Sequence, residues 1–329
     1  MTKKHITLKM FLFVKKNVPA AMTNQTEITH FILMGLTDCQ ELQSILFVLF
    51  LTLYLATLLG NGTILFIADS QLHSPMYFFL GHLSCLDIFY STVTVPKMLD
   101  GFLSNLQTIS FSGCMTQLHF FHFLGSTEVL LLGIMACDRC VAICNPLRYT
   151  IIMQKKVCLL LATATWSTGF FHALMHAIMT ANLSFCGPNH IDHFFCDIKP
   201  LLKLACGNTQ LNIMLLNIVT SCIAMSPFII ILFSYIYIII FILFKVQSKN
   251  GLQKAFSTCG SHLMVVAMLY VPVFLNYMFP SVGEATKKEM VITLVYSAIT
   301  PVLNPLIYTL RNQEVKIALQ KILKILTFH

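Results

Sequence analysis

The chain has 329 residues, of which 57% are hydrophobic and only 10% are charged, and its formal net charge is +8. A soluble domain carries about 25% charged residues, so a water-soluble globule of this composition would expose large apolar patches. A disordered chain would be much more polar. The composition therefore predicts a membrane protein.

Long apolar stretches with few or no charges recur along the chain and are centred near residues 55, 86, 124, 168, 228, 268 and 300; Asp87 interrupts the second and Glu128 the third. A transmembrane helix needs about 20 apolar residues, and backbone groups in lipid must be paired within the segment. The run 228–244 does not alternate as a β-barrel strand would. The turn-forming cluster 186–190 predicts that the fourth helix ends near Thr180 and the fifth begins near Leu211. We predict an all-α membrane protein, a seven-transmembrane helix bundle.

Lysine and arginine counts alone leave the orientation open. Eleven lie in the segments on one side and ten on the other, and five of those ten precede residue 17. Asn24-Gln25-Thr26 is a glycosylation acceptor, which is used only outside the cytosol. This signal predicts an extracellular N-terminus and a cytoplasmic C-terminus in a multi-pass plasma-membrane protein, with the inner cations near anionic lipid. Met22 is an alternative start, so residues 1–21 are interpreted as an upstream extension or a tail.

Five of the twelve cysteines fall on the predicted outer side: Cys39, Cys114, Cys186, Cys196 and Cys206. The outer loop after the fourth helix needs tethering, which disulfides provide by restricting its unfolded ensemble. Four cysteines allow three pairings, and spacing alone does not choose between them. Metal binding by these cysteines is disfavoured because no CxxC spacing occurs.

Two carboxylates lie inside predicted spans, Asp87 in the second and Glu128 in the third. Ionisable groups within a membrane are costly and point to function. Two interpretations stay open at this stage. The pair shares a cation or a proton, or each carboxyl is neutral, hydrogen-bonded and structural.

Five short motifs carry a family resemblance. They are Gly60-Asn61, the string Pro75-Met76-Tyr77-Phe78-Phe79-Leu80, the segment Asp138–Pro146 with Val141-Ala142-Ile143-Cys144, the string Lys254-Ala255-Phe256-Ser257-Thr258-Cys259, and Asn304-Pro305-Leu306-Ile307-Tyr308. Together they resemble an olfactory (odorant) receptor of the tetrapod type, within the rhodopsin-like G-protein-coupled receptors. The resemblance extends from about residue 23 to the C-terminus.

The resemblance implies an organisation and a set of structural residues. An extracellular tail, 1–41, precedes a receptor domain, 42–310, and a cytoplasmic segment, 311–329, that contains a short amphipathic helix lying on the membrane. Cys114 is implied to pair with Cys196, and Cys186 with Cys206. Asp87 and Glu128 are implied to form a sodium site or a polar network; no other cofactor is implied. Activation and G-protein coupling are implied for Asp138, Arg139, Tyr235, His262, Asn304, Pro305 and Tyr308.

The resemblance also implies a ligand cavity between the helices and a sensory function. A neutral volatile ligand fits the expected cavity level, where no charged anchor occurs, and its binding is expected to activate a stimulatory heterotrimeric G protein and raise cAMP. No enzyme activity and no nucleic-acid partner are expected. The candidate ligand-binding residues are Leu118, Phe121, His122, Gly125, Ser126, Val219, Ile223, Tyr270, Phe274, Tyr277 and Ser297.

Three other interpretations compete with this one. The family usually has tyrosine where this chain has Cys137 and Cys140, so a receptor-like chain with impaired G-protein coupling is one alternative. A seven-helix transporter is another, although no internal repeat supports it. A retinal-binding photoreceptor is excluded, because the seventh span, 290–310, lacks the lysine that a Schiff base needs.

Overall fold

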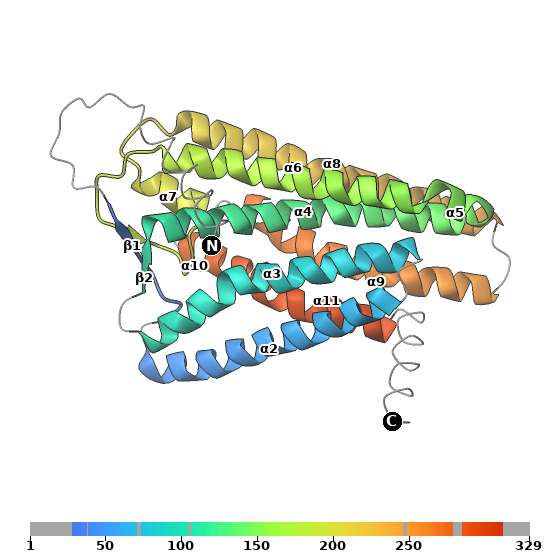
Figure 1. The fold of residues 1–329 in the computed structure, drawn as a ribbon, viewed down its shortest axis with the longest axis horizontal. Coiled ribbons are helices and arrows are strands. Elements are labelled where there is room, and N and C mark those ends of the chain that lie inside the picture. Colours follow the sequence, from blue (N-terminus) through green and yellow to red (C-terminus); the bar gives the residue numbers. More distant parts are fainter. Residues whose placement is uncertain are drawn as a thin grey trace, which may run out of the picture.

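The computed structural model describes residues 28–37, 39–70, 74–104, 107–245, 249–278 and 285–311. Figure 1 shows long helices running side by side along the longest axis of the molecule. They are α2 (Gln40–Ser70), α3 (Pro75–Leu103), α4 (Phe111–Cys144), α6 (Lys155–Ala181), α8 (Gln210–Lys245) and α9 (Lys249–Met278). The last crossing combines α10 (Ala285–Leu294), the π-helical η3 (Val295–Ile299) and α11 (Thr300–Arg311).

The described residues contain six helices that are long and apolar enough to cross a membrane, and α9 adds the shorter apolar stretch Cys259–Phe274. The predicted seven-transmembrane bundle is therefore confirmed. The fourth crossing ends at Ala181 and the fifth begins at Gln210, each within one residue of the prediction. Large apolar side chains such as Leu243 and Phe244 face outward, as contact with lipid requires.

Local sequence signals set several helix ends. Pro75 occupies the first turn of α3, where its missing N–H costs nothing. The hydroxyl of Ser110 caps α4 by accepting a hydrogen bond from the backbone N–H of Gly113 at 3.1 Å. At the other end of α4, Asn145 is followed by Pro146 in the short 3-10 helix η2 (Pro146–Arg148) and then α5 (Tyr149–Ile152).

One end of the bundle, called the outer end after the predicted orientation, is covered by a small sheet and by α7 (Ile198–Leu204), which lie at the same end in Figure 1. The opposite end is called the inner end. The sheet order is β2-β1-β3, with β1 (His30–Leu33) antiparallel to β2 (Thr108–Ser110) and parallel to β3 (His190–Ile191). Phe31 of the central strand is fully buried in an outer apolar cluster that also contains Cys114 and Cys196. A separate, larger cluster fills the bundle below it.

Close helix packing depends on small residues at the contact points. A Cβ added at Gly169 of α6 would lie 2.2 Å from Thr127 Oγ1 and 3.0 Å from the Phe123 carbonyl oxygen of α4. At Gly133 of α4 an added Cβ would lie 2.9 Å from Pro227 Cβ of α8. Small residues let transmembrane helices approach closely enough for backbone and side chains to pack.

We expect Gly169→Ala to lower the thermal unfolding midpoint of the purified protein. The new methyl group cannot fit unless α4 and α6 separate, and overpacking of this kind costs about 1–3 kcal/mol. Gly62→Ala is the matched control, because an added Cβ at Gly62 meets nothing within 4 Å and alanine improves helix propensity. Equal midpoints for the two variants would show that the α4–α6 contact is not tight.

Candidate functional site

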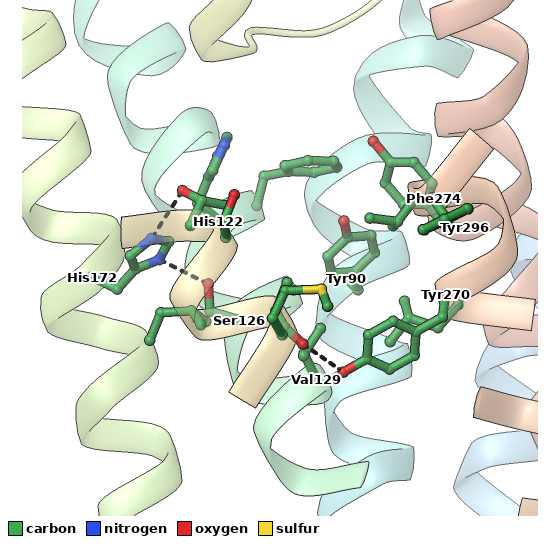
Figure 2. A pocket seen from close by; sticks show the side chains of 17 residues that line it. Tyr90, His122, Ser126, Val129, His172, Tyr270, Phe274 and Tyr296 are labelled. Atoms are coloured by element: carbon green, nitrogen blue, oxygen red, sulfur yellow. Dashed lines mark hydrogen bonds between the residues drawn. The ribbon is translucent and has the colours of Figure 1, made fainter. Parts of the chain in front are cut away.

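A cavity of about 350 Å³ lies inside the bundle between α3, α4, α6, α8, α9 and η3. Its volume falls in the range of small-molecule sites. Figure 2 shows side chains from these helices pointing into it. Seven of the eleven predicted ligand residues line the cavity: Phe121, His122, Gly125, Ser126, Ile223, Tyr270 and Phe274.

Three predicted ligand residues do not line the cavity. Leu118 is fully buried one turn further out, in the outer apolar cluster around the Cys114–Cys196 bridge. Val219 of α8 does not line the cavity, whereas its neighbour Thr220 and the predicted Ile223 do. Ser297 does not line the cavity, whereas its neighbour Tyr296 does, and both lie in the π-helical turn η3. The side chain of the fourth, Tyr277, lies outside the described residues.

The sequence interpretation missed several lining residues, among them Tyr90, Val129, His172, Thr220, Leu269 and Tyr296. His172 had a usable signal. It lies with His176 in the middle of the apolar fourth span, where polar side chains are rare and commonly functional. The others are ordinary residues of apolar helices, and only their orientation brings them to the cavity.

One wall of the cavity is polar. Ser126 Oγ of α4 lies 2.8 Å from His172 Nδ1 of α6, and His172 Nε2 lies 3.3 Å from Thr220 Oγ1 of α8. Figure 2 shows both contacts as dashed lines. Leu269, Val273 and Phe274 contribute apolar lining from α9. The cavity therefore combines hydrogen-bonding groups with an apolar surface.

His122 connects the cavity to the outer loop. Its Nδ1 lies 3.1 Å from the Leu118 carbonyl oxygen, and its Nε2 lies 3.5 Å from Asp197 Oδ1. Asp197 also caps α7, because its Oδ1 accepts a hydrogen bond from the Ile198 N–H at 2.7 Å. Movement of the loop and contacts on α4 are thus physically linked.

Two disulfides hold the outer loop. Cys114 at the start of α4 is bonded to Cys196, and Cys186 is bonded to Cys206. These are the two pairings that the family resemblance implies. Gln117 of α4 supports the first bridge, since its Oε1 accepts a hydrogen bond from the Cys196 N–H at 3.0 Å. Cys39 is a free, exposed thiol.

His193 is buried in the same loop between Phe194 and Phe195, with ring centroids 4.7 and 4.6 Å away. Burial lowers the pKa of its imidazole from 6.5 to about 4, against the opposing effect of Asp197. Between pH 6.5 and 4 the His193 side chain is therefore protonated in the unfolded protein but not in the folded protein. Stability rises with pH across this window and is lost as the pH falls.

We expect the thermal unfolding midpoint of the protein to decrease between pH 7 and pH 4.5, and His193→Phe to flatten this dependence. The difference between the two pKa values corresponds to about 3 kcal/mol at most. His190→Phe, at an exposed position in the same loop, is the control and should keep the dependence of the parent chain. An unchanged pH profile in His193→Phe would assign the effect to other groups.

At the inner end of α4, Asp138 and Arg139 form a network of polar contacts with neighbouring residues. Asp138 pairs with Arg139, and Asp138 Oδ1 accepts a hydrogen bond from the Tyr149 hydroxyl at 2.8 Å. Arg139 Nη1 also donates to Met76 Sδ at 3.1 Å. Burial, followed by the neighbouring Asp138 carboxylate, raises the pKa of Tyr149, so the phenol stays protonated and donates.

A second contact connects α8 and α9 to α4. His262 Nε2 lies 3.1 Å from the Leu132 carbonyl oxygen, which can only accept a hydrogen bond, so this nitrogen carries the proton. His262 Nδ1 then accepts from the Tyr235 hydroxyl at 2.9 Å. The neutral tautomer is fixed, and it joins three helices near their inner ends.

The buried carboxylates Asp87 and Glu128 lie close enough for their charges to interact. Asn304 Nδ2 donates to both oxygens of Asp87, at 3.0 and 3.1 Å. Glu128 Oε1, Asn304 Oδ1 and Ser297 Oγ have no hydrogen-bond partner among the described residues. Within the same residues, no group of three or more His, Cys, Asp or Glu is arranged as a metal site. The candidate ligand atoms here are oxygens, the atom type that hard cations prefer.

The seventh crossing is fastened to the first. Asn61 Nδ2 donates to the Pro301 carbonyl oxygen at 2.9 Å. A Cβ at Gly60 would lie 3.0 Å from Pro305 Cγ, so glycine allows the approach of α11 to α2. Tyr308 is buried on the same helix. The predicted glycosylation site Asn24 and the predicted amphipathic helix, 314–326, lie outside the described residues.

Comparison with known proteins identifies the chain's relatives. The olfactory receptor family model matches residues 50–325. Human olfactory receptor 12D1 is 58% identical over 92% of this chain and 95% of its own length. Human olfactory receptor 12D2 is 56% identical over 92% and 99%, and rat olfactory receptor 1 is 47% identical over 91% and 96%. This multi-pass membrane protein therefore belongs to the olfactory receptor family, a family of receptors rather than enzymes.

Proposed function

We propose that the chain is an odorant receptor that binds small, neutral, volatile molecules in the bundle cavity and activates a stimulatory heterotrimeric G protein, raising cAMP. The cavity carries this proposal. Among the described residues that line it there is no lysine, arginine, aspartate or glutamate, which disfavours an ionic ligand. The proposed orientation has the N-terminus outside and the C-terminus in the cytoplasm of the plasma membrane.

The proposed mechanism is a shift between two arrangements of the bundle. A ligand activates only if it binds the active arrangement better than the resting one. In the proposed resting arrangement, Asp138 holds Arg139 against its own helix, and the Tyr235–His262 contact joins α8 and α9 to α4. Their rearrangement, with Asn304, Pro305 and Tyr308 in the seventh crossing, would open a surface for the G protein.

The test is cAMP output from cells that express the chain from Met1 or from Met22, with surface staining scored in parallel. A panel of neutral volatiles should include at least one compound that raises cAMP in a dose-dependent way. Cells expressing a human 12D receptor serve as the control for receptor delivery. Robust surface staining with no response to any volatile would contradict the proposed function.

A second candidate is a receptor with impaired coupling. Cys137 Sγ contacts Ser234 Oγ of α8 at 4.0 Å, and Cys140 interacts with Cys144 on the same helix. These thiols replace the larger phenols that the family resemblance leads us to expect. We expect Cys137→Tyr with Cys140→Tyr to increase maximal cAMP at equal surface staining. An unchanged maximum would remove impaired coupling as an explanation.

We also propose that Asp87 and Glu128 share one sodium ion or one proton. Two buried carboxylates repel each other when both are ionised, and either partner relieves that repulsion. If the partner is sodium, replacing sodium with choline should change basal cAMP in the parent chain but not in Asp87→Asn with Glu128→Gln. An identical sodium response in both chains would exclude the ion.

A further inference from the structure

The polar wall of the cavity is an unbroken chain of hydrogen bonds across three helices. It runs from Ser126 on α4 to His172 on α6, then to Thr220 on α8, and returns to His176 on α6. The last contact joins Thr220 Oγ1 and His176 Nε2 at 3.4 Å. Ser126, His172 and Thr220 line the cavity, whereas His176 is buried behind them at 2% exposure.

This chain can carry its protons in two directions. A neutral imidazole has one donor and one acceptor nitrogen, and a hydroxyl both donates and accepts. In the first direction His172 Nδ1–H donates to Ser126 Oγ, the Thr220 hydroxyl donates to His172 Nε2, and His176 Nε2–H donates to Thr220 Oγ1. In the second direction all three bonds are reversed. In both cases each of the three contacts joins one donor to one acceptor.

The two directions present different chemistry to a ligand at Ser126. In the first, the Ser126 hydroxyl proton is left to donate to a carbonyl oxygen. In the second, the Ser126 hydroxyl donates its proton to His172 Nδ1, and Ser126 Oγ is free to accept a hydrogen bond from a ligand hydroxyl. A site with a fixed direction discriminates strongly against the wrong partner, because a buried polar group stays unpaired. A reversible chain avoids this penalty.

The rest of the lining is mostly apolar, with Tyr90, His122, Ser221 and Tyr296 as further polar side chains. Phe121, Leu269, Val273 and Phe274 present apolar surface, which suits a hydrocarbon skeleton. Tyr270 adds little donor capacity, since its hydroxyl proton is donated to the Ala224 carbonyl oxygen at 3.0 Å. Figure 2 shows Ser126 and His172 on one side of the cavity and Tyr270 and Phe274 on the other.

We propose that the Ser126–His172–Thr220–His176 chain is the polar recognition element of this receptor, and that its ligands are neutral molecules with one oxygen function, alcohols and carbonyl compounds of the same skeleton alike. This inference rests on the proposed function for the location of the ligand. It adds the chemical class and the residue that contacts the oxygen.

The test measures binding without signalling. Purified full-length receptor in detergent is heated with a thiol-reactive fluorophore, which reports unfolding through the buried free thiols Cys144, Cys158 and Cys259. The probes are octan-1-ol, octanal and octane, and 2-phenylethanol, phenylacetaldehyde and ethylbenzene. A ligand that binds only the folded state raises the midpoint according to its concentration relative to Kd.

In at least one series we expect the alcohol and the aldehyde to bind with Kd values within about tenfold of each other, and the hydrocarbon about tenfold more weakly. Ser126→Ala should weaken both oxygenates about tenfold and leave the hydrocarbon unchanged. Thr163→Ala is the matched control: it removes an exposed hydroxyl of α6 that bonds only the Leu159 carbonyl oxygen of its own helix. It should behave as the parent chain.

Several outcomes would overturn the proposal. They are a strong preference for only the alcohol or only the aldehyde in both series, hydrocarbon binding equal to that of the oxygenates, full oxygenate binding in Ser126→Ala, or no shift with any probe. Octanoate or octylammonium binding more tightly than octan-1-ol would also refute it. Thermal shifts without any cAMP response would instead refute the coupling in the proposed function and leave the ligand class intact.

Discussion

Replacing Cys114 or Cys196 with serine is expected to remove most of the receptor from the cell surface. The bridge spans a sequence separation of 82 residues and ties the outer loop to the first turn of α4. In the chain-entropy model, a disulfide that closes a loop of this length stabilises the folded state by about 4 kcal/mol. Both sulfurs are also fully buried in the outer apolar cluster, so each serine would place a hydroxyl in an apolar environment.

The measurement is surface immunostaining normalised to total protein, with the unfolding midpoint of any purified variant. Cys39→Ser is the matched control, because Cys39 is free and exposed, and it should match the parent chain. Cys186→Ser should have a smaller effect, since its bridge to Cys206 closes a separation of only 20 residues. Normal surface levels for Cys114→Ser would show that the sheet and the apolar cluster hold the loop without the bridge.

Asp138→Asn is expected to raise basal cAMP about ten- to a hundredfold. This factor applies when nearly all of the parent receptor is in the resting arrangement without ligand. The carboxylate of Asp138 is 1% exposed and holds Arg139 in place. A hydrogen bond between charged groups contributes about 1.5–3 kcal/mol, and losing it from the resting arrangement shifts the equilibrium by the corresponding factor. Tyr149→Phe removes only one neutral donor to the same carboxylate and should raise basal cAMP less.

Arg139→Ala, combined with Asp138→Asn, should return basal cAMP to the level of cells without receptor. We extend the proposed mechanism by one step, in which the Arg139 guanidinium released from Asp138 contacts the G protein. Without that guanidinium, removing the Asp138 carboxylate should not raise basal cAMP. The measurement is basal cAMP at matched surface staining, and it needs no identified ligand. If the double variant kept the high basal output of Asp138→Asn, Arg139 would be a purely structural partner of that carboxylate.

The positions of the seven crossings followed directly from the sequence. Charged residues cannot be left in lipid without large cost, so the gaps between them mark the helices. The turn cluster 186–190 excluded a continuous helix between the fourth and fifth crossings, and α6 and α8 end and begin within one residue of the expected positions. The short motifs indicated the family and, through it, the disulfide pairings.

The tertiary structure decided which faces of these helices enclose the cavity. In a helix of a soluble protein the apolar face marks the protein interior. A membrane helix is apolar toward both lipid and protein, so its hydrophobic pattern does not show which face is turned to the interior. The prediction therefore named Val219 and Ser297, whereas their neighbours Thr220 and Tyr296 line the cavity. Likewise, the sequence located a histidine in the fourth span, but only the packing of α4, α6 and α8 placed His172 between Ser126 and Thr220.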